Sequence, residues 1–415
     1  MRDRDLYAKL LGIETPWWVR DVDPRIEEQE VEIFISYDER IEVACPTCGG
    51  TGSRYGTATK QWRHLDTMQY TTLLTATVPR VKCPEHGVLQ MKVPWAEPGS
   101  GFTAMFEALA IDWLKEASTT AVARLLNMTW DQVDGIMSRA VERGLARREA
   151  QPLGHIGIDE TSYQKRHEYV TVIYDRERGH VIDVLDDRTR FSLEEFYFAT
   201  PLEHLETIES VSMDMWGNYI EATLVHVPDA ESKIAFDRFH VAKHIGDAVN
   251  KVRVTEHAEL LADGDKQLSG TRYLWLQNPE NMKPGNRVRF NALRKTSLRV
   301  ARAWAMKETA RGMWSYRTRG WARRGWTKLL GWMSRSRLAP MVKVARTIRS
   351  HLWGIINAIV LRVTNAHLEA VNAKIQALKK RACGYRNRER FRNAILFHCG
   401  GLDLYPGALA TNSNS

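Results

Sequence analysis

Two short, matching motifs near the N-terminus constrain the fold of this chain more than any other feature. The first is Cys45-Pro-Thr-Cys48-Gly and the second is Cys83-Pro-Glu-His86-Gly. In each motif two metal-binding side chains stand two residues apart at a turn, which is the ligand spacing of structural zinc sites. The 34 residues between Cys48 and Cys83 include a Thr- and Val-rich stretch, so we expect paired strands that bring the motifs together.

The sequence therefore predicts one structural zinc ion bound by Cys45, Cys48, Cys83 and His86, with His64 as a substitute ligand. The alternative is that both motifs are ordinary turns. The chain has five cysteines, and their odd number and uneven spacing argue against a disulfide framework. The cysteine count thus favours metal binding by the first three.

A helical pattern follows, after a linker rich in Pro, Gly and Ser. We expect a helix at 102–115 and a helix-turn-helix over 118–136. Ser118 and Thr129 are suited to cap its two helices, and Asn127 is suited to turn the chain between them. The side chains left to face a DNA groove are Trp130, Asp131, Gln132 and Arg139. An ordinary helical hairpin is the alternative.

Short apolar strands alternate with helices from about residue 151. We expect strands at 154–160, 169–174, 179–186, 211–217 and 233–241, with helices beginning near Leu193 and Tyr219. Three antiparallel strands, then helix, strand, helix and strand, is the order of a ribonuclease-H-like domain. In that order Asp159 and Asp214 would lie on adjacent strands, with both carboxylates at one end of the sheet.

The positive charge of the chain is concentrated in one window. Residues 281–350 hold 19 Lys or Arg and one acid, Glu308. The window carries +18 and the whole chain +9, which leaves −9 for all other residues. Such asymmetry predicts a polyanion-binding surface on a mildly acidic protein.

Aromatic residues are interleaved with the arginines of this basic window. The tryptophans are Trp304, Trp314, Trp321, Trp326 and Trp332. Aromatic rings can stack on unpaired bases while arginines bind phosphates. The predicted DNA contacts are Arg317, Arg319, Arg323 and Arg324. The alternative is that the tryptophans form the core of a helical bundle, which we expect for at least half of them.

A helix near the C-terminus carries a single acid, Glu369, at its start. Leu368, Val371, Ile375 and Leu378 have helical spacing, so one stripe can pack inward. Eight Lys and Arg follow between 374 and 392, against one acid, Glu389. One carboxylate beside dense positive charge suits a site for metal ions and a nucleic-acid backbone. The predicted backbone contacts here are Lys379, Lys380, Arg381 and Arg386. A solvated basic helix is the alternative.

The three acids lie in motifs that resemble the DDE transposases of bacterial insertion sequences. The motifs are Gly-Ile-Asp159-Glu, Ser-Met-Asp214-Met-Trp and Leu-Glu369-Ala-Val-Asn-Ala-Lys, followed by Gly384-Tyr-Arg-Asn. The closest resemblance is to the group called the ISL-three family, and it covers nearly the whole chain. Asp237-Arg-Phe-His240 resembles the Asp-x-x-His element of several DDE lineages. The family's usual Gly after the catalytic Glu is Ala370 here.

The resemblance implies phosphodiester cleavage followed by strand transfer with two Mg²⁺ ions about 4 Å apart, for which Mn²⁺ can substitute. It implies Asp159 as the bridging ligand, Asp214 and Glu369 as ligands of one ion each, and His240 as a donor to the scissile phosphate or a proton carrier. Glu160 rivals Asp159, and Asp237 rivals Asp214. Strand alternation would turn Glu160 away from Asp159.

The fold class expected from these features is mixed α/β and multidomain. The parts are a zinc module (1–98), a helix-turn-helix (99–150), a catalytic domain (151–256 and 351–400) interrupted by a basic helical insertion (257–350), and a disordered tail (401–415). The expected partner is double-stranded DNA, both the element's terminal inverted repeats and the target, bound by a homodimer or larger assembly.

The function expected from these parts is that of an active transposase. No secretion signal or membrane span is seen, so we expect a bacterial cytoplasmic protein associated with the nucleoid. Two other functions stay open. One is a non-catalytic DNA-binding regulator derived from a transposase, and the other is a ribonuclease-H-like nuclease or resolvase.

Overall fold

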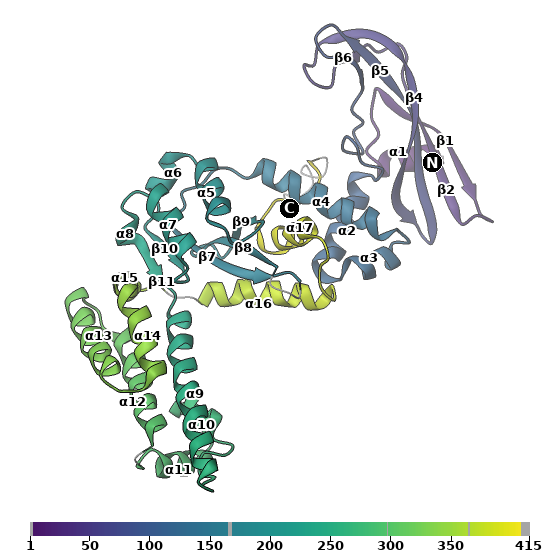
Figure 1. Ribbon diagram of the computed structural model, residues 1–415. Coiled ribbons are helices and arrows are strands. Elements are labelled where there is room, and N and C mark those ends of the chain that lie inside the picture. The colour runs from purple at the N-terminus through teal and green to yellow at the C-terminus, as the bar shows by residue number, and fades with distance from the viewer. Residues whose placement is uncertain (1–2, 165–167, 297, 364–365, 408–415) are drawn as a thin grey trace. The chain divides into compact units, whose positions relative to one another are not determined.

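The computed structural model describes residues 3–164, 168–296, 298–363 and 366–407, and of residues 366–369 only the backbone (Figure 1). The chain divides into two compact units, which are described separately. The first comprises residues 1–149 with 401–415, and the second residues 150–400. Within the described residues, no helix is long and apolar enough to cross a membrane.

The first unit begins with a sheet of order β1-β2-β5-β4-β3, in which β6 also pairs with β5. Its elements are α1 (Asp3–Leu10), β1 (Trp17–Arg25), β2 (Glu30–Tyr37), β3 (Val43–Ala44), β4 (Thr51–Thr67), β5 (Tyr70–Cys83) and β6 (Gly87–Gln90). Strand β5 lies in the Thr- and Val-rich stretch where paired strands were expected. Its partner β4 has a weak pattern in the sequence, because it is mostly exposed and polar.

Long antiparallel pairing between β4 and β5 brings the two cysteine motifs together. The ladder runs from Thr67 opposite Tyr70 to Ser53 opposite Lys82. Cys45 and Cys48 precede β4, and Cys83 ends β5, so both motifs lie at the open end of this hairpin. The expected strand pairing is confirmed.

The second part of this unit is helical, with α2 (Ala104–Glu116), α3 (Thr119–Leu125) and α4 (Trp130–Arg147). Ser118 caps α3, Thr129 caps α4, and Asn127 turns the chain with φ of +51°. Val133 and Ile136 are fully buried. All of these features agree with the predicted helix-turn-helix, because caps and a left-handed Asn are local signals.

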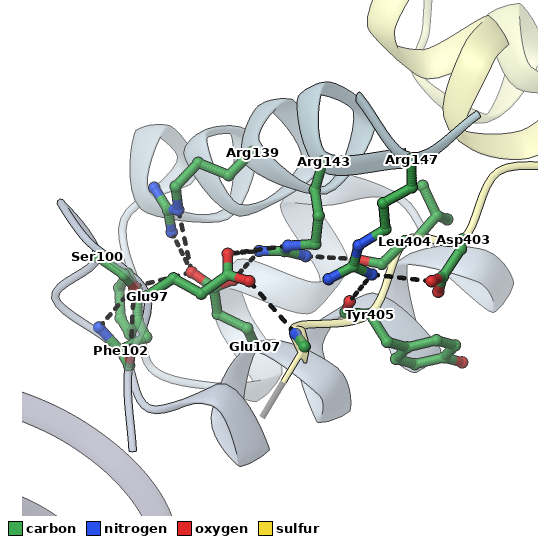
Figure 2. A network of polar contacts seen from close by, with 11 residues as sticks. Glu97, Ser100, Phe102, Glu107, Arg139, Arg143, Arg147, Asp403, Leu404 and Tyr405 are labelled. Carbon is green, nitrogen blue, oxygen red and sulfur yellow. Dashed lines mark hydrogen bonds and ion pairs between the residues drawn. The ribbon is translucent and has the colours of Figure 1, made fainter. Parts of the chain in front are cut away.

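A buried carboxylate of α2 organises the helices of this unit. Glu107 is 1% exposed, and its oxygens accept from Arg139 at 2.6 Å and from Arg143 at 2.9 Å (Figure 2). A buried carboxylate is costly unless it is paired, so these two arginines are needed for the packing of α4 on α2. Arg139, which was predicted to face a DNA groove, is thus held in an ion pair with Glu107, and its contact with DNA stays a prediction.

The C-terminal residues 401–407 form an ordered strap on the same helices (Figure 2). Arg147 donates to the carboxylate of Asp403 at 2.8 Å and to the carbonyl of Tyr405 at 2.6 Å. A Cβ at Gly144 would lie 2.6 Å from the Cβ of Leu402, so this glycine allows the close approach. The predicted disordered tail is wrong for residues 401–407, and residues 408–415 lie outside the described part of the chain.

The second unit is built on a sheet of order β11-β10-β7-β8-β9. Its strands are β7 (His155–Ser162), β8 (Tyr169–Asp175), β9 (Val181–Leu185), β10 (Ser210–Met213) and β11 (Ile234–Phe236). Strands β7, β8 and β9 are antiparallel neighbours, whereas β10 runs parallel to β7 and β11 parallel to β10. Short helices join the later strands, namely α5 (Arg190–Ala199), α6 (Leu202–Glu206), α7 (Gly217–His226) and α8 (Ala230–Lys233).

Gly157 in the centre of β7 is required by the ring of Tyr174. A Cβ at position 157 would lie 2.0 Å from Cζ of Tyr174, which crosses β7 from the neighbouring strand β8. Tyr174 is itself buried, at 1% exposure. The glycine two residues before Asp159 is thus fixed by packing and not by chemistry.

Helices fill the rest of this unit. They are α9 (Arg238–Ala262), α10 (Arg272–Leu276), α11 (Pro284–Leu293), α12 (Arg299–Gly312), α13 (Arg319–Ser334), α14 (Ala339–Ser350), α15 (Leu352–Val360), α16 (Ala366–Arg381) and α17 (Arg388–Cys399), with single 3-10 turns at Pro279–Asn281 and Met313–Ser315. Helix α9 runs through the boundary predicted between 256 and 257. One apolar core joins the sheet to α9–α15, because Phe236 of β11 lies directly on Gly354 of α15.

Three of the five tryptophans of the basic window belong to this core. Trp326 is fully buried in this core, and Trp304 and Trp314 are partly buried and pack against the core. Trp321 and Trp332 are exposed, at 62% and 38%. The expectation that at least half of these rings are structural is confirmed.

Candidate active site and metal site

Three sulfur ligands and one imidazole converge at the end of the β4–β5 hairpin. The ligand atoms of Cys45, Cys48, Cys83 and His86 all lie within 4.8 Å of one another. Sγ of Cys48 is 3.8 Å from Sγ of Cys83, and Nδ1 of His86 is 3.6 Å from Sγ of Cys83. Ligands about 2.3 Å from a tetrahedral ion stand roughly 3.8 Å apart, so this cluster fits a structural zinc ion.

The local backbone favours thiolate at Cys45. The backbone N–H of Cys48 lowers the pKa of the Cys45 thiol to about 6. A thiolate is the form that binds metal. His64 lies outside the cluster, because its Nδ1 is hydrogen-bonded at 2.9 Å to the hydroxyl of Thr103, the N-cap of α2. Burial lowers the pKa of His64 to about 4. His64 is thus a buried neutral side chain and not a substitute ligand.

Three aspartates lie at one edge of the second sheet. Asp159 is in β7, Asp214 directly follows β10, and Asp237 directly follows β11. Ser212 of β10 pairs with Gly157 of β7, and the amide of Asp237 donates to the carbonyl of Met213 at 3.0 Å. Because the three strands run parallel, their carboxyl ends meet at the same edge. The predicted neighbourhood of Asp159 and Asp214 is therefore present in the structure.

His240 binds two of these aspartates. Its Nδ1 is 3.2 Å from the carboxylate of Asp214, and its Nε2 is 3.9 Å from that of Asp237. The hydrogen bond to Asp214 raises the pKa of His240 above its ordinary value. Burial alone would raise the pKa of Asp214, but His240 outweighs it and the pKa is lowered. Burial, with Asp159 and Asp214 nearby, raises the pKa of Asp237.

A cavity of about 350 Å³ opens onto these groups. Asp159, Asp214 and His240 line it, and further lining residues are Glu160, Tyr169, Tyr219, Lys243, His244 and Asp247. His240, Lys243, His244 and Asp247 have the i, i+3, i+4, i+7 spacing of one face of α9. This spacing can be read from the sequence, but we did not predict from it that Lys243, His244 and Asp247 lie at the site. Strand alternation did not turn Glu160 away from the cavity, because it lies near the end of β7.

Arg188 is a second group that the sequence did not single out. Its guanidinium is 3.5 Å from the carboxylate of Glu160 and lies over the ring of Trp216, 5.3 Å from the centroid. Burial raises the pKa of Glu160, and Arg188 opposes that shift. Glu160 is thus committed to an ion pair, whereas Asp159 has none among the described residues.

Helix α16 is attached to β7 by three side chains on one face. Asn372 donates to the carboxylate of Asp159 at 2.6 Å, Gln376 donates to the hydroxyl of Thr161 at 3.3 Å, and Lys379 donates to Ser162. Residues 372, 376 and 379 are a helical i, i+4, i+7 series. Lys379, predicted as a DNA contact, is therefore held at the sheet.

The remaining predicted site residues are placed as follows. The side chain of Glu369 lies outside the described residues, and only its backbone in α16 is described. Gln132 closes the capping box of α4, and Trp130 is half-buried. The arginines and lysines at exposed positions are Arg317, Arg319, Arg323, Arg324, Lys380, Arg381 and Arg386.

Three family models match successive parts of the chain. The zinc-finger model of the IS204/IS1001/IS1096/IS1165 transposases matches residues 41–86, and the helix-turn-helix model of transposase family ISL3 matches 91–141. The DDE transposase model of the same family matches 156–395, more than half of the chain. Each match covers one of the sites described above.

Curated relatives agree over nearly the full length. The chain is 28% identical over 443 aligned positions to a transposase for insertion sequence element IS1557 of Mycobacterium tuberculosis, covering 98% of both chains. It is 24% identical to a transposase for insertion sequence element IS1001 of Bordetella parapertussis, covering 94% of this chain and 97% of that one. The chain therefore belongs to the ISL3 family of transposases.

Proposed function

We propose that this protein binds the ends of its own insertion sequence and catalyses Mg²⁺-dependent cleavage and strand transfer. The observation that carries the proposal is the meeting of Asp159 and Asp214 at the edge of parallel-paired strands, beside a cavity, with α16 attached to β7 at Asp159. Acids at strand ends can bind metal ions, and an adjoining cavity leaves room for a phosphodiester.

The sheet order β11-β10-β7-β8-β9 supports assigning this unit to the ribonuclease-H-like class. In this assignment the helices between β11 and α16 are the basic insertion, which separates the second aspartate from Glu369 in the sequence. The division into a zinc module, a helix-turn-helix and a split catalytic domain stays our proposal. The ends of the insertion need adjusting, because α9 is continuous across position 257.

We assign Asp159, Asp214 and Glu369 as the metal-binding acids. Position 369 precedes Asn372 by three residues, so helical periodicity puts it on the same face of α16, one turn nearer the helix start. Since Asn372 reaches Asp159, this face is the one turned to the aspartates. Asp237, buried and with a raised pKa, is proposed as the partner that orients His240 and not as a ligand.

The donor set of this edge fits Mg²⁺. The ion prefers carboxylate oxygens and retains waters, so it needs only one or two carboxylates from the protein. When bound, a pair of such ions stabilises the attacking and leaving oxygens of an in-line displacement. Among the described residues, however, only the cysteine–histidine cluster has three or more ligand atoms within 4.8 Å. Asp159 and Asp214 are instead hydrogen-bonded to Asn372 and His240.

The chain's own groups have separate roles in this proposal. His240, charged more readily because of Asp214, donates to the scissile phosphate or carries a proton. The helix-turn-helix reads the element's ends, and the cysteine–histidine cluster holds one structural zinc. Double-stranded DNA is the proposed partner.

The test is incubation of the purified protein with labelled element ends and Mg²⁺, followed by analysis of the strands. A nick at the element boundary that disappears in Asp214→Asn supports the proposal. Sequence-specific binding without any nick would instead identify a DNA-binding regulator. Cutting of branched DNA without preference for element ends would identify a nuclease or resolvase.

A further inference from the structure

The positive charge of residues 281–350 is divided between two kinds of helix. On α12, three of the four cations have acidic partners: Arg299 pairs with Glu259, and Lys307 and Arg311 pair with Glu308 at 2.8 and 2.9 Å. These three residues therefore contribute little free charge. Other cations of the window have no acidic partner among the described residues, and one group of them lies on α13 and α14.

One groove of about 740 Å³ on α13 and α14 gathers this uncompensated charge. Its lining residues are Gly320, Arg323, Arg324, Thr327, Lys328, Gly331, Arg335 and Arg349. Five of the eight are cations, and no acid lines the groove. Across the part of the chain that the structure describes, none of these five cations has an acidic partner. Like charges at this density repel one another, so the groove favours a polyanion.

The groove follows one face of α13. Its lining positions from 320 to 335 recur at helical spacing, whereas the opposite face of α13 is buried in the core through residues such as Trp326 and Leu330. The fold therefore fixes which side of α13 is free. Arg349 is added from α14, where its guanidinium donates to the hydroxyl of Ser334 at 3.2 Å.

Two glycines in this face are not explained by packing. A Cβ at Gly320 would meet nothing within 4 Å, and one at Gly331 would meet only the guanidinium of Arg335, at 3.4 Å. Gly325 is different, because a Cβ there would lie 2.6 Å from the ring of Tyr316. Gly331 lies in the interior of α13, where glycine weakens a helix, so it carries a cost without a structural return. At both positions the missing side chain lets a ligand come close to the helix between the cationic side chains.

We propose that this groove binds the phosphodiester backbone of duplex DNA. A guanidinium group can bind two phosphate oxygens at once, and the five cations that line this groove, four from α13 and its C-cap and one from α14, can neutralise phosphates of a DNA strand. The inference deepens the proposed function, on which it rests for the choice of DNA as the polyanion. It adds Lys328, Arg335 and Arg349 to the contacts expected from composition, and it separates Arg323 and Arg324 from Arg317 and Arg319, which do not line the groove.

The experiment measures binding of the full chain to a labelled duplex of random sequence at a series of salt concentrations. The test variant is R335Q/R349Q, which removes two groove cations. The slope of log affinity against log salt should fall by about 1.8, at roughly 0.9 for each lost phosphate contact. The matched control is R299Q/R311Q, which removes the same charge from ion-paired positions on α12 and should leave the slope unchanged.

An unchanged slope for R335Q/R349Q, or an equal fall in both variants, would overturn the groove assignment. If R335Q/R349Q melts at a lower temperature than the wild type, the exposed pair R323Q/R324Q replaces it with the same expectation. Cleavage of element ends is measured separately. A wild-type protein that cuts ends, with an unchanged slope in the variants, disproves only the groove. A changed slope in a protein that cuts nothing disproves only the proposed activity.

Discussion

The cysteine–histidine cluster and the carboxylate edge, which we propose as a second metal site, differ in design. The first takes its ligands from two turns at the end of one hairpin, and its four ligand atoms already lie within 4.8 Å of one another. The second would take acids from separate strands and a distant helix, and Asp159 and Asp214 are hydrogen-bonded to Asn372 and His240. If the proposal holds, the structural site is closed by the fold, whereas the catalytic site keeps exchangeable partners.

Removal of zinc should have the largest effect, because the closed site contributes to folding. Cys83→Ser is expected to abolish tight zinc binding and to unfold the N-terminal module, since structural zinc contributes folding free energy on the order of 10 kcal/mol. Metal analysis and limited proteolysis of the purified protein measure both effects. The second unit should stay folded, because its core is its own. Unchanged zinc content in Cys83→Ser would disprove this ligand set.

Glu369→Gln should have the next largest effect, and it should act on chemistry alone. The variant keeps the shape of α16 and removes one negative charge from the carboxylate edge, which is the open site of the comparison above. We expect cleavage and strand joining to fall by roughly a thousandfold, equivalent to about 4 kcal/mol of transition-state stabilisation. Binding of element ends, measured side by side, should stay near the wild-type value. If Glu369→Gln cuts normally, Glu389 at the exposed start of α17 is the next acid to test.

The sequence predicted the parts of both sites that depend on short-range patterns. The Cys-x-x-Cys spacing, the caps Ser118 and Thr129, the strand that contains Asp159 and the strand that precedes Asp214 are such signals. The family resemblance was also confirmed. In each case the helix cap, strand or metal motif is formed by the same few neighbouring residues whose types and spacing predict it.

The residues that the sequence did not reveal depend on contacts between distant segments. Arg139 was assigned to DNA because its partner Glu107 lies 32 positions away on α2. Asn372 was passed over because Asp159 is 213 positions away. The strap at 401–407 is held by the hydrogen bonds of Arg147 to Asp403 and Tyr405 and by the close approach that Gly144 allows, and both partners lie more than 250 positions away in the sequence. Sequence patterns do not encode such pairings.

His64 should make the folding stability of the zinc module depend on pH, although it is not a zinc ligand. This separates the effect of acid on the fold of the module from its effect on the metal site. Its pKa is about 4 in the folded protein and roughly 6.5 when unfolded. Between these values the unfolded state binds more protons, so stability falls as the pH drops from 6.5 to 4, by about 3 kcal/mol in all. His64→Asn keeps a side chain that can hydrogen-bond to Thr103 and should remove this part of the acid sensitivity.

The measurement is hydrogen exchange of the β4 and β5 amides at pH 7 and pH 5, corrected for the intrinsic effect of pH on exchange. The wild type should lose more protection than His64→Asn on acidification. Zinc ligands titrate equally in both proteins, so the difference isolates His64. Equal losses of protection would show that the imidazole is already protonated in the folded state.

Asn372 tests whether the open site is shaped by the helix that carries Glu369. Its amide donates to Asp159 at 2.6 Å and so orients this carboxylate. Removing a group that orients a metal ligand typically costs 10–100-fold in metal affinity, and we expect a loss of about that size in Asn372→Ala. Calorimetric titration with Mn²⁺ measures the affinity directly, and the Mg²⁺ dependence of cleavage measures its consequence.

Gln376→Ala is the matched control for this variant. It removes the next hydrogen bond on the same face of α16, to Thr161, without touching a carboxylate. If Asn372 orients Asp159, only Asn372→Ala should need more Mg²⁺, and saturating Mg²⁺ should restore its cleavage, which it cannot do for Glu369→Gln. If both alanine variants lose metal affinity equally, the helix is simply anchored by the sum of its contacts. The open site would then depend on the docking of α16 as a whole, as the closed site depends on its hairpin.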